Sequence, residues 1–479
     1  MQESEIFAIK GKIVGGIFAL TTRTFLLQII SFSATVVLTI LLTPEIFGIY
    51  YVVSAVIAFL AYFSDIGFAA ALIQKKEEPS DDELATVFTI QQLLVGSLVL
   101  TAFILAPFFA NFYNLSSSGV FLLRALIIAF FLSSLKTISS VLLERKLEFS
   151  LLVIPQLLET VGFYLVAIVL AYRGFGVDSF AWAALTRGII GLLAIYIVSP
   201  WKIRLGVNIN AIKQLLTFGV PFQTNSILAL VKDDLMTIFL GKILPFTEIG
   251  YIGWAKKWAE VPLRLIMDSI IRVTFPAYSR LRENSAVLKS ALEKSFFALS
   301  LVIFPASSLL ILTVHPLIYI IPKYQKWEPA IFSFYIFTIV SIIAAFSTTS
   351  VNAMNALGKI KITLILMVLW TVLTWTLIPG LVPIFGFNGV SVAFLLIAVT
   401  SFIPIFITKQ IVHFTFIAHV YKPFFVSMLL LTGSYLLQQS FSNIFGVILS
   451  VVVFTILYGL FLIKWYRQDL LTYMRLIVS

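Results

Sequence analysis

The stretch YIGWAKKWAEVPLRLIMDSIIRVTF (251–275) has the length of a membrane-spanning helix but carries charges where hydrocarbon is expected. Its charged residues follow one another at spacings of three or four: Lys257, Glu260, Arg264, Asp268 and Arg272. At about 100° per residue, this spacing places them on one face of a helix. Because an unpaired charge in hydrocarbon is costly, that face must meet protein or water. The stretch therefore predicts a polar surface in the interior of a membrane protein.

The rest of the chain is similarly apolar. Of its 479 residues, 60% are hydrophobic and 11% are charged, and the mean hydropathy is +1.05. This composition predicts an all-α integral membrane protein rather than a soluble globule. About fourteen runs are long enough to cross about 30 Å of hydrocarbon as helices. They cover 13–40, 46–64, 84–111, 119–142, 151–171, 179–199, 214–241, 247–275, 291–314, 328–350, 362–379, 387–408, 422–438 and 443–464.

The net charge of +11 is explained by membrane topology. If both termini are cytoplasmic, nineteen Lys and Arg residues lie in the inner segments. The outer connections then hold only Arg173, Lys242, Lys323 and Lys326. This asymmetry follows the positive-inside rule. We therefore expect a multi-pass protein of the cytoplasmic membrane, in contact with membrane lipids, and no nucleic-acid partner.

Several chemical functions have no support in the sequence. The chain has no Cys, and its three His residues stand apart without metal-ligand spacing. It has no Gly-Lys-Ser/Thr phosphate-binding loop, and its short connections leave no room for a catalytic domain. We expect a protein that is not an enzyme and that needs no metal or cofactor. Its driving force is expected to be a gradient, a membrane potential or the imbalance of its own substrate.

A weak internal repeat appears at an offset of about 200 residues. Glu45 corresponds to Glu248, and Asp65 to Asp268, both at a shift of 203. The repeat predicts two parallel six-helix bundles, 1–199 and 200–415, followed by a terminal helix pair in 416–479. Parallel repeats of this kind typically place a substrate site between the halves.

Seven motifs resemble, in their order and spacing, the polysaccharide transporter family of the multidrug/oligosaccharidyl-lipid/polysaccharide exporter superfamily. They are LTPEIFG (42–48), SDIGFAAALIQ (64–74), LAPFFANFY (105–113), LLRAL (122–126), LLERKLEF (142–149), LTFGVPF (216–222) and FPAYSRLREN (275–284). Ile46 departs from the family, which usually has an acidic residue there. The resemblance implies an O-antigen, capsule or exopolysaccharide flippase that can act as a monomer. It also implies a polyprenyl-diphosphate-linked oligosaccharide substrate and, as further partners, polysaccharide-assembly proteins.

Polar residues within the spans are the candidates for a cavity that binds the diphosphate headgroup. We expect Arg23, Gln28, Asn225, Lys232, Lys257 and Arg264 to line it. The competing interpretation is local pairing, of Lys232 with Asp233 and Asp234 and of the 251–275 charges with one another. Asp65, Asp268 and Glu260 are candidates for gating or ion coupling, although bonds to loop amides are the simpler interpretation for both aspartates. For Arg187, pairing with Glu159 is favoured over substrate contact.

Two other classes of function remain open from the residues alone. A cation or drug antiporter of the related multidrug branch should prefer intramembrane carboxylates, whereas the surfaces here are basic or balanced. A membrane sugar polymerase or glycosyltransferase needs a substantial outer loop, and the longest one, 315–328, has a single acidic residue. A lipid II-type flippase has nearly the same chemistry as the leading hypothesis and cannot be separated from it by sequence.

Overall fold

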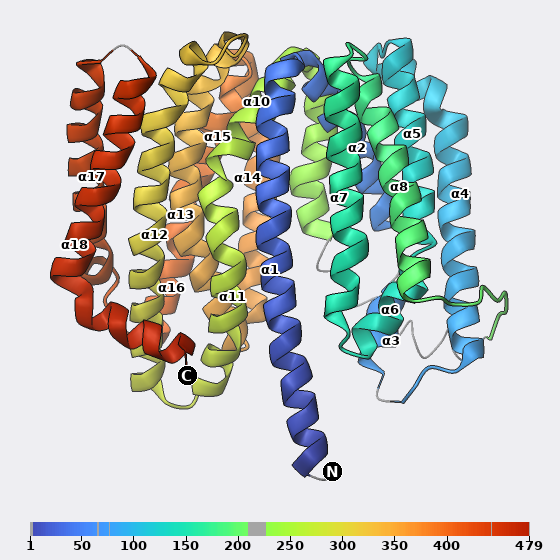
Figure 1. Ribbon diagram of the computed structural model, residues 1–479, viewed down its shortest axis with the longest axis horizontal. Coiled ribbons are helices and arrows are strands. Elements are labelled where there is room, and N and C mark those ends of the chain that lie inside the picture. Colours follow the sequence, from blue (N-terminus) through green and yellow to red (C-terminus); the bar gives the residue numbers. More distant parts are fainter. Residues whose placement is uncertain (1–2, 65–66, 76, 209–226, 442, 479) are drawn as a thin grey trace. The chain divides into compact units, whose positions relative to one another are not determined.

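The computed structural model describes residues 3–64, 67–75, 77–208, 227–441 and 443–478, and these are helical without any strand (Figure 1). The chain divides into two compact units, Met1–Gly253 and Trp254–Ser479. The first contains α1 (Glu3–Leu41), α2 (Pro44–Tyr62), α3 (Phe68–Gln74), α4 (Asp81–Tyr113), α5 (Ser117–Ser134), α6 (Thr137–Arg145), α7 (Phe149–Tyr172), α8 (Asp178–Val198) and a helix over 227–243. The helix α10 (Phe246–Ala259) crosses the boundary between the units.

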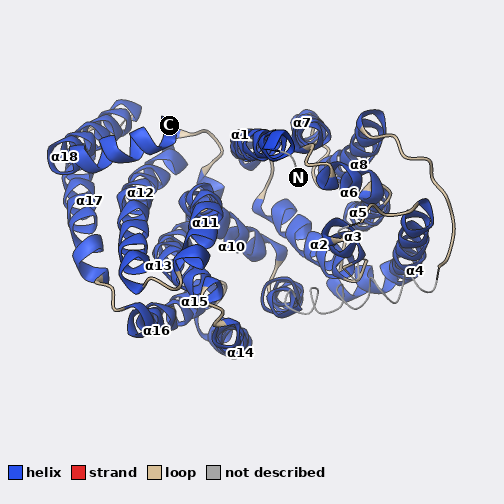
Figure 2. Ribbon diagram, turned by 90° about the horizontal axis from the view of Figure 1, so that it is seen from below, coloured by secondary structure: helices blue, strands red, loops and turns tan. Residues whose placement is uncertain are grey.

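The second unit continues from α10 with a further series of helices. They are α11 (Val261–Leu281), α12 (Ser285–Ile320), the short 3-10 helix η1 (Gln325–Ala330), α13 (Ile331–Ala356), α14 (Ile360–Phe385), α15 (Asn388–Thr400), α16 (Phe402–Val412), α17 (Phe416–Gln439) and α18 (Ile444–Val478). Within this unit α12, α17 and α18 pack side by side (Figure 2). The predicted domain limits at 199 and 415 stay a prediction.

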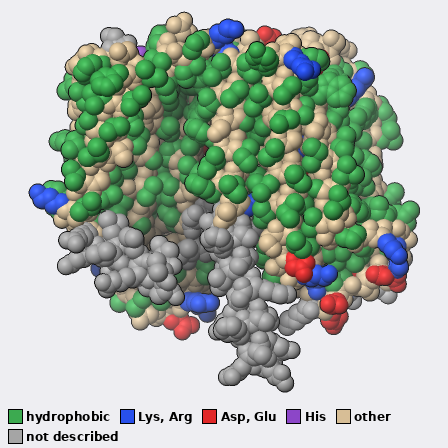
Figure 3. Space-filling model, viewed as in Figure 1, with side chains coloured by type: hydrophobic (Ala, Val, Ile, Leu, Met, Phe, Trp, Pro, Cys, Tyr) green, Lys and Arg blue, Asp and Glu red, His purple; other side chains and the backbone are tan. Residues whose placement is uncertain are grey.

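Twelve helical segments in the described part of the chain are long and apolar enough to cross a membrane. Their outer flanks are apolar, since Ile104, Leu165 and Ile365 are 69%, 60% and 67% exposed. Figure 3 shows hydrophobic side chains covering the helix flanks, with charged side chains near the helix ends. An exposed apolar belt of this kind is stable only in lipid. The chain is therefore a multi-pass membrane protein, and the count of fourteen spans stays a prediction.

Several predicted spans are divided between two helices, among them 387–408, where α15 ends at Thr400 and α16 begins at Phe402. The run 247–275 is not one helix, because α10 ends at Ala259 and α11 begins at Val261. Pro262 lacks an amide hydrogen and so breaks the helical hydrogen-bond ladder at this point.

The run 119–142 is divided between α5 and α6. At this junction the Ser134 carbonyl accepts hydrogen bonds from Gln92 and Thr137 at 3.3 and 3.0 Å, and the Leu135 carbonyl accepts one from Tyr196 at 3.3 Å. Side chains thus satisfy backbone groups that a continuous helix would pair internally.

In the first unit α7 lies against α1 and α8. Elsewhere in this unit, glycines allow α2 and α10 to pack closely. A Cβ added at Gly48 of α2 would lie 1.8 Å from the Phe246 carbonyl oxygen, and one at Gly250 of α10 would lie 1.9 Å from that of Pro44. The starts of α2 and α10 therefore approach each other so closely, on both sides, that neither glycine tolerates a side chain.

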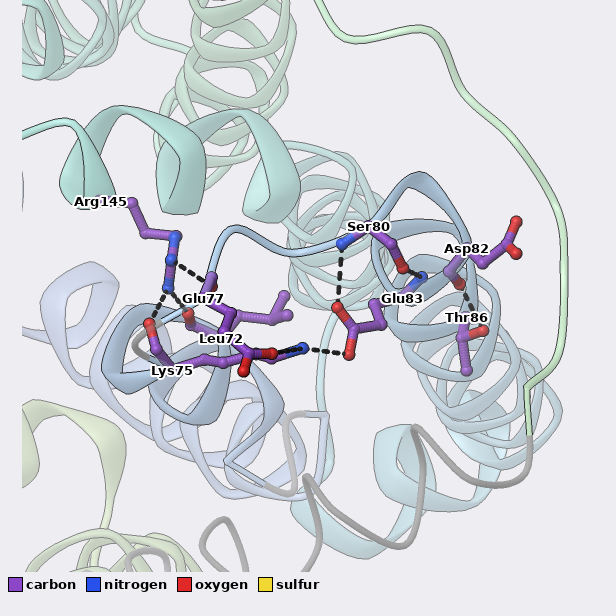
Figure 4. Close-up of polar contacts among 8 residues, drawn as sticks. All are labelled: Leu72, Lys75, Glu77, Ser80, Asp82, Glu83, Thr86 and Arg145. Carbon is purple, nitrogen blue, oxygen red and sulfur yellow. Dashed lines mark hydrogen bonds and ion pairs between the residues drawn. The ribbon is translucent and has the colours of Figure 1, made fainter.

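The connection between α3 and α4 is held by a network of polar contacts (Figure 4). Arg145, at the end of α6, donates hydrogen bonds to the carbonyls of Leu72, Lys75 and Glu77, the last two at 2.8 and 2.7 Å. Lys75 pairs with Glu83 at 2.5 Å, and Glu83 completes a capping box with Ser80 at the start of α4. These bonds fix the connection against α6 and give α4 a defined beginning.

Candidate functional site

The charged stripe of 251–275 is partly neutralised by its own carboxylate. Arg264 donates to Glu260 Oε2 from Nη2 at 2.7 Å and from Nε at 3.2 Å, and Lys256 Nζ lies 4.0 Å from Glu260 Oε1. We call these three residues the Glu260 cluster. The Arg264 side chain remains 59% exposed, and Lys256 also lies over the ring of Phe394, 4.9 Å from its centroid. The local-pairing interpretation therefore holds for Glu260 and Arg264, with one cation in excess.

Of the remaining residues of the stripe, the structure describes the side chain of Lys257 but not those of Asp268 and Arg272. Lys257 is partly buried near the end of α10, before the interruption at Glu260. Around Glu260 the helical bonds from its amide to the Lys256 carbonyl and from the Arg264 amide to its own carbonyl are present at 3.0 and 2.9 Å, so the charged face continues from α10 into α11.

Arg23 of α1 contacts α7. Its Nη1 donates to Gln156 Oε1 at 2.7 Å. Arg23 also interacts electrostatically with Glu144 of α6: burial raises the pKa of the Glu144 carboxyl, and the positive charge of Arg23 lowers it. Arg23, at the start of the candidate span Thr22–Leu41, is thus hydrogen-bonded to α7 and attracted electrostatically by Glu144 of α6.

Several other polar residues of α1 contact protein in the C-terminal half of the helix. Ser31 shares a 2.6 Å hydrogen bond with Tyr164 of α7, and Thr35 and Thr39 are 3% and 1% exposed. Gln28 is partly buried, and the structure records no hydrogen bond for it among the described residues. The predictions that Arg23 and Gln28 line the cavity stay predictions.

The candidates beyond α1 in the first unit are only partly described. Lys232 Nζ lies 3.0 Å from Asp233 Oδ1, so local neutralisation occurs there as well. Asn225 and Asp65 lie outside the described residues. Among the described residues no group of His, Asp and Glu could hold a metal ion.

A second three-residue cluster lies deep in the first unit. Glu159 of α7 accepts a 2.5 Å hydrogen bond from Lys136 at the α5–α6 junction, and its Oε2 lies 3.7 Å from Nε of Arg187 on α8. We call this the Glu159 cluster. The Glu159 side chain is 10% exposed. The expected pair of Arg187 and Glu159 is therefore present, but Lys136, the nearer partner, was not predicted from the sequence.

Two solved structures share this fold over most of the chain. The lipid II flippase MurJ, in an inward closed conformation, superposes with a TM-score of 0.71 at 16% identity, covering 93% of this chain and 100% of that one. An inward-facing multidrug resistance MATE family transporter of the MOP superfamily superposes with a TM-score of 0.59 at 17% identity, covering 79% of this chain and 94% of that one. The chain is thus a multi-pass membrane protein with the MurJ/MATE-like fold.

The family follows from the sequence match. Residues 37–331, more than half of the chain, match the family described as "Polysaccharide biosynthesis protein", and the chain belongs to it. This confirms the resemblance stated from the motifs.

Named relatives are distant. The chain is 22% identical over 264 residues to the succinoglycan biosynthesis transport protein ExoT of Rhizobium meliloti (strain 1021), covering 55% of this chain and 52% of the relative. It is 23% identical over 249 residues to the teichuronic acid biosynthesis protein TuaB of Bacillus subtilis (strain 168), covering 50% of each. It is 24% identical over 270 residues to the lipopolysaccharide biosynthesis protein WzxC of Escherichia coli (strain K12), covering 54% of this chain and 53% of the relative. The chain thus spans about half the length of these relatives.

Proposed function

We propose that this protein is a flippase that moves a polyprenyl-diphosphate-linked oligosaccharide across the cytoplasmic membrane for cell-surface polysaccharide synthesis. Membership of the polysaccharide biosynthesis family and a fold shared with a lipid II flippase support this class. The observation that carries the substrate assignment is the cationic excess of the Glu260 cluster together with neighbouring Lys257. Cations inside a membrane protein attract the diphosphate, whose charge cannot cross hydrocarbon alone.

The proposed mechanism is alternating access without covalent chemistry. The diphosphate and sugars occupy a cationic, hydrated cavity while the polyprenyl tail stays in lipid, and two parallel six-helix bundles rock to expose the cavity on the other side. Both termini lie in the cytoplasm in this proposal, as the positive-inside bias predicts. The headgroup site consists of Lys257, Arg264, Arg23 and Lys232, with Gln28 and Asn225 as polar neighbours. Gating by Asp65, Asp268 or Glu260 belongs to the same proposal.

The test is native mass spectrometry with a purified polyprenyl-diphosphate oligosaccharide, comparing the wild type with a Lys257→Ala/Arg264→Ala variant. We expect a lipid adduct in the wild type that is lost in the variant. We also expect each single substitution to abolish translocation in reconstituted vesicles at normal protein levels.

Each other outcome of these experiments would favour a different site or a different function. Full transport by both single variants would remove the headgroup site from these residues. Absence of any adduct, in variant and wild type alike, would favour the cation or drug antiporter of the multidrug branch. An adduct formed equally well by lipid II would favour the lipid II-type flippase.

A further inference from the structure

The first unit contains a mostly apolar cavity, with some polar lining residues, that the proposed headgroup site does not use. It has a volume of about 460 Å³ and is lined by residues of α2, α4, α5, α6, α7 and α8. Its polar lining includes Arg187, Gln91, Ser133 and Thr137. Small-molecule sites in proteins are typically about 300–1,000 Å³. The cavity is therefore large enough for a hydrated guest inside membrane-spanning helices.

Arg187 is the charged residue among the described lining of this cavity, and its charge is incompletely compensated. The Glu159 cluster has two cations and one carboxylate. Lys136 is the closer of the two cations, with its Nζ 2.5 Å from Glu159 Oε1. Arg187 approaches Glu159 only through Nε at 3.7 Å, beyond hydrogen-bond distance, and its side chain is 57% exposed. The described part of the chain supplies no hydrogen bond to Arg187. Its guanidinium therefore remains available to a ligand in the cavity.

Gln91, another polar residue of the lining, has one unsatisfied side-chain atom. The residue is 5% exposed, and its Nε2 donates to Thr137 Oγ1 at 3.0 Å. Its Oε1 is buried and has no hydrogen-bond partner among the described residues. A buried acceptor without a donor is uncommon in proteins. An unsatisfied acceptor and an excess cation therefore occur in the residues around this cavity.

We propose that this cavity is an anion site, in which Arg187 binds a phosphate or diphosphate group. The planar guanidinium matches two phosphate oxygens at once, and the Ser133 hydroxyl at the cavity wall adds a donor. The phosphate comes either from a lipid headgroup or from a free inorganic anion. The site lies within the first unit and does not depend on Lys257 or Arg264.

Substitutions in the Glu159 cluster test the proposal, because removing a cation and removing the carboxylate should change anion binding in opposite directions. Purified protein in phosphatidylcholine nanodiscs is titrated with inorganic pyrophosphate at constant ionic strength, and its thermal unfolding is followed by Trp fluorescence. Arg187→Gln should weaken the pyrophosphate response at least about tenfold. Glu159→Gln removes the opposing charge and should strengthen it by about tenfold. Each response is measured relative to the same variant without anion, so a change in basal stability cancels.

Two controls distinguish anion binding at Arg187 from a general effect of charge or folding. Lys136→Met with Glu159→Gln removes one charge of each sign and should keep the wild-type response even if Glu159→Gln alone folds poorly. Arg124→Gln removes a cation of α5 that does not line the cavity and should have no effect. A response that survives Arg187→Gln and disappears in Lys257→Ala/Arg264→Ala would overturn this proposal and leave the proposed flippase site standing.

A lipid arm identifies the source of the phosphate. The titration is repeated in nanodiscs in which phosphatidylglycerol replaces part of the phosphatidylcholine. Stabilisation by phosphatidylglycerol alone, lost in Arg187→Gln, would assign the site to a lipid headgroup, whereas stabilisation by pyrophosphate would assign it to a soluble anion. No Arg187-dependent response to either probe would overturn the anion site.

Discussion

The Glu159 and Glu260 clusters contain the same kinds of charged residue, but they are assembled differently: one from separate helices, the other from neighbouring turns. Each combines one carboxylate with a Lys and an Arg, and in each the Arg side chain is more than half exposed, at 57% and 59%. The Glu260 cluster is formed by residues four apart on neighbouring turns. The Glu159 cluster joins the α5–α6 junction, α7 and α8. Equal charge can therefore be arranged by helix geometry in one region and by tertiary packing in another.

The difference has energetic consequences. A pair between neighbouring turns is present whenever the helix forms and gains little from the rest of the protein. Glu159, at 10% exposure, is held between Lys136 and α8, where Gly191 leaves it space. Removing one partner from such a buried group leaves an uncompensated charge. The buried Lys136–Glu159 pair should therefore be structural, whereas the pairs of the Glu260 cluster are free to change partners.

The largest expected effect is on stability after loss of a carboxylate. Glu159→Ala should lower the free energy of unfolding by about 3–5 kcal/mol, because Lys136 is left buried without its partner. Glu260→Ala should lower it by less than about 1 kcal/mol. Equilibrium unfolding in bicelles measures both. Equal losses in the two variants would remove the distinction between the clusters.

A glycine substitution tests the packing around Glu159. A Cβ at position 191 would lie 2.1 Å from Glu159 Oε1, so Gly191→Ala should displace the carboxylate and destabilise the protein by about 1–3 kcal/mol. Gly96→Ala in α4 is the matched control, since nothing lies within 4 Å of the added carbon. A neutral Gly191→Ala would mean that Glu159 can move without loss.

Double-mutant cycles measure the pair energies directly. The coupling between Lys136 and Glu159 should exceed about 1 kcal/mol, because both side chains are mostly buried. The coupling between Glu260 and Arg264 should be about 0.3–0.5 kcal/mol, as for other pairs four residues apart on a helix. The same bicelle unfolding assay gives both values, and a larger coupling for Glu260 would reverse the comparison.

The smallest expected effect is that of exchanging the charges of Glu260 and Arg264. Glu260→Arg/Arg264→Glu keeps a pair at the same spacing and should cost only a few tenths of a kcal/mol, on the order of the preference for Glu on the N-terminal side. Lys136→Glu/Glu159→Lys should be poorly tolerated, because the two sites differ in burial and in their neighbours. Folded yield and melting temperature compare the two exchanges. Equal tolerance would show that the Glu159 site is not specialised.

Some features of the candidate site could be predicted from sequence because they depend on near neighbours. The pairing of Glu260 with Arg264 and of Lys232 with Asp233 follows from spacing alone. The interruption at Glu260 was missed, although Pro262 was visible, because a strong apolar pattern was interpreted as one continuous span. The division of 119–142 could not be foreseen, since its carbonyls are taken by Gln92 and Tyr196 from other helices.

The sequence by itself determined that this is a helical membrane protein of the polysaccharide biosynthesis family. The lengths of the apolar runs, the uneven distribution of basic residues between loops and the order of the motifs can all be read along the chain. In a bilayer, an apolar segment must pair its own backbone hydrogen-bonding groups, and a helix does this. Only the tertiary structure decided that Lys136 joins Arg187 at Glu159, and that a cavity with an unsatisfied Gln91 oxygen lies beside them. These features depend on distances between helices far apart in the chain, which periodicity within one helix cannot specify.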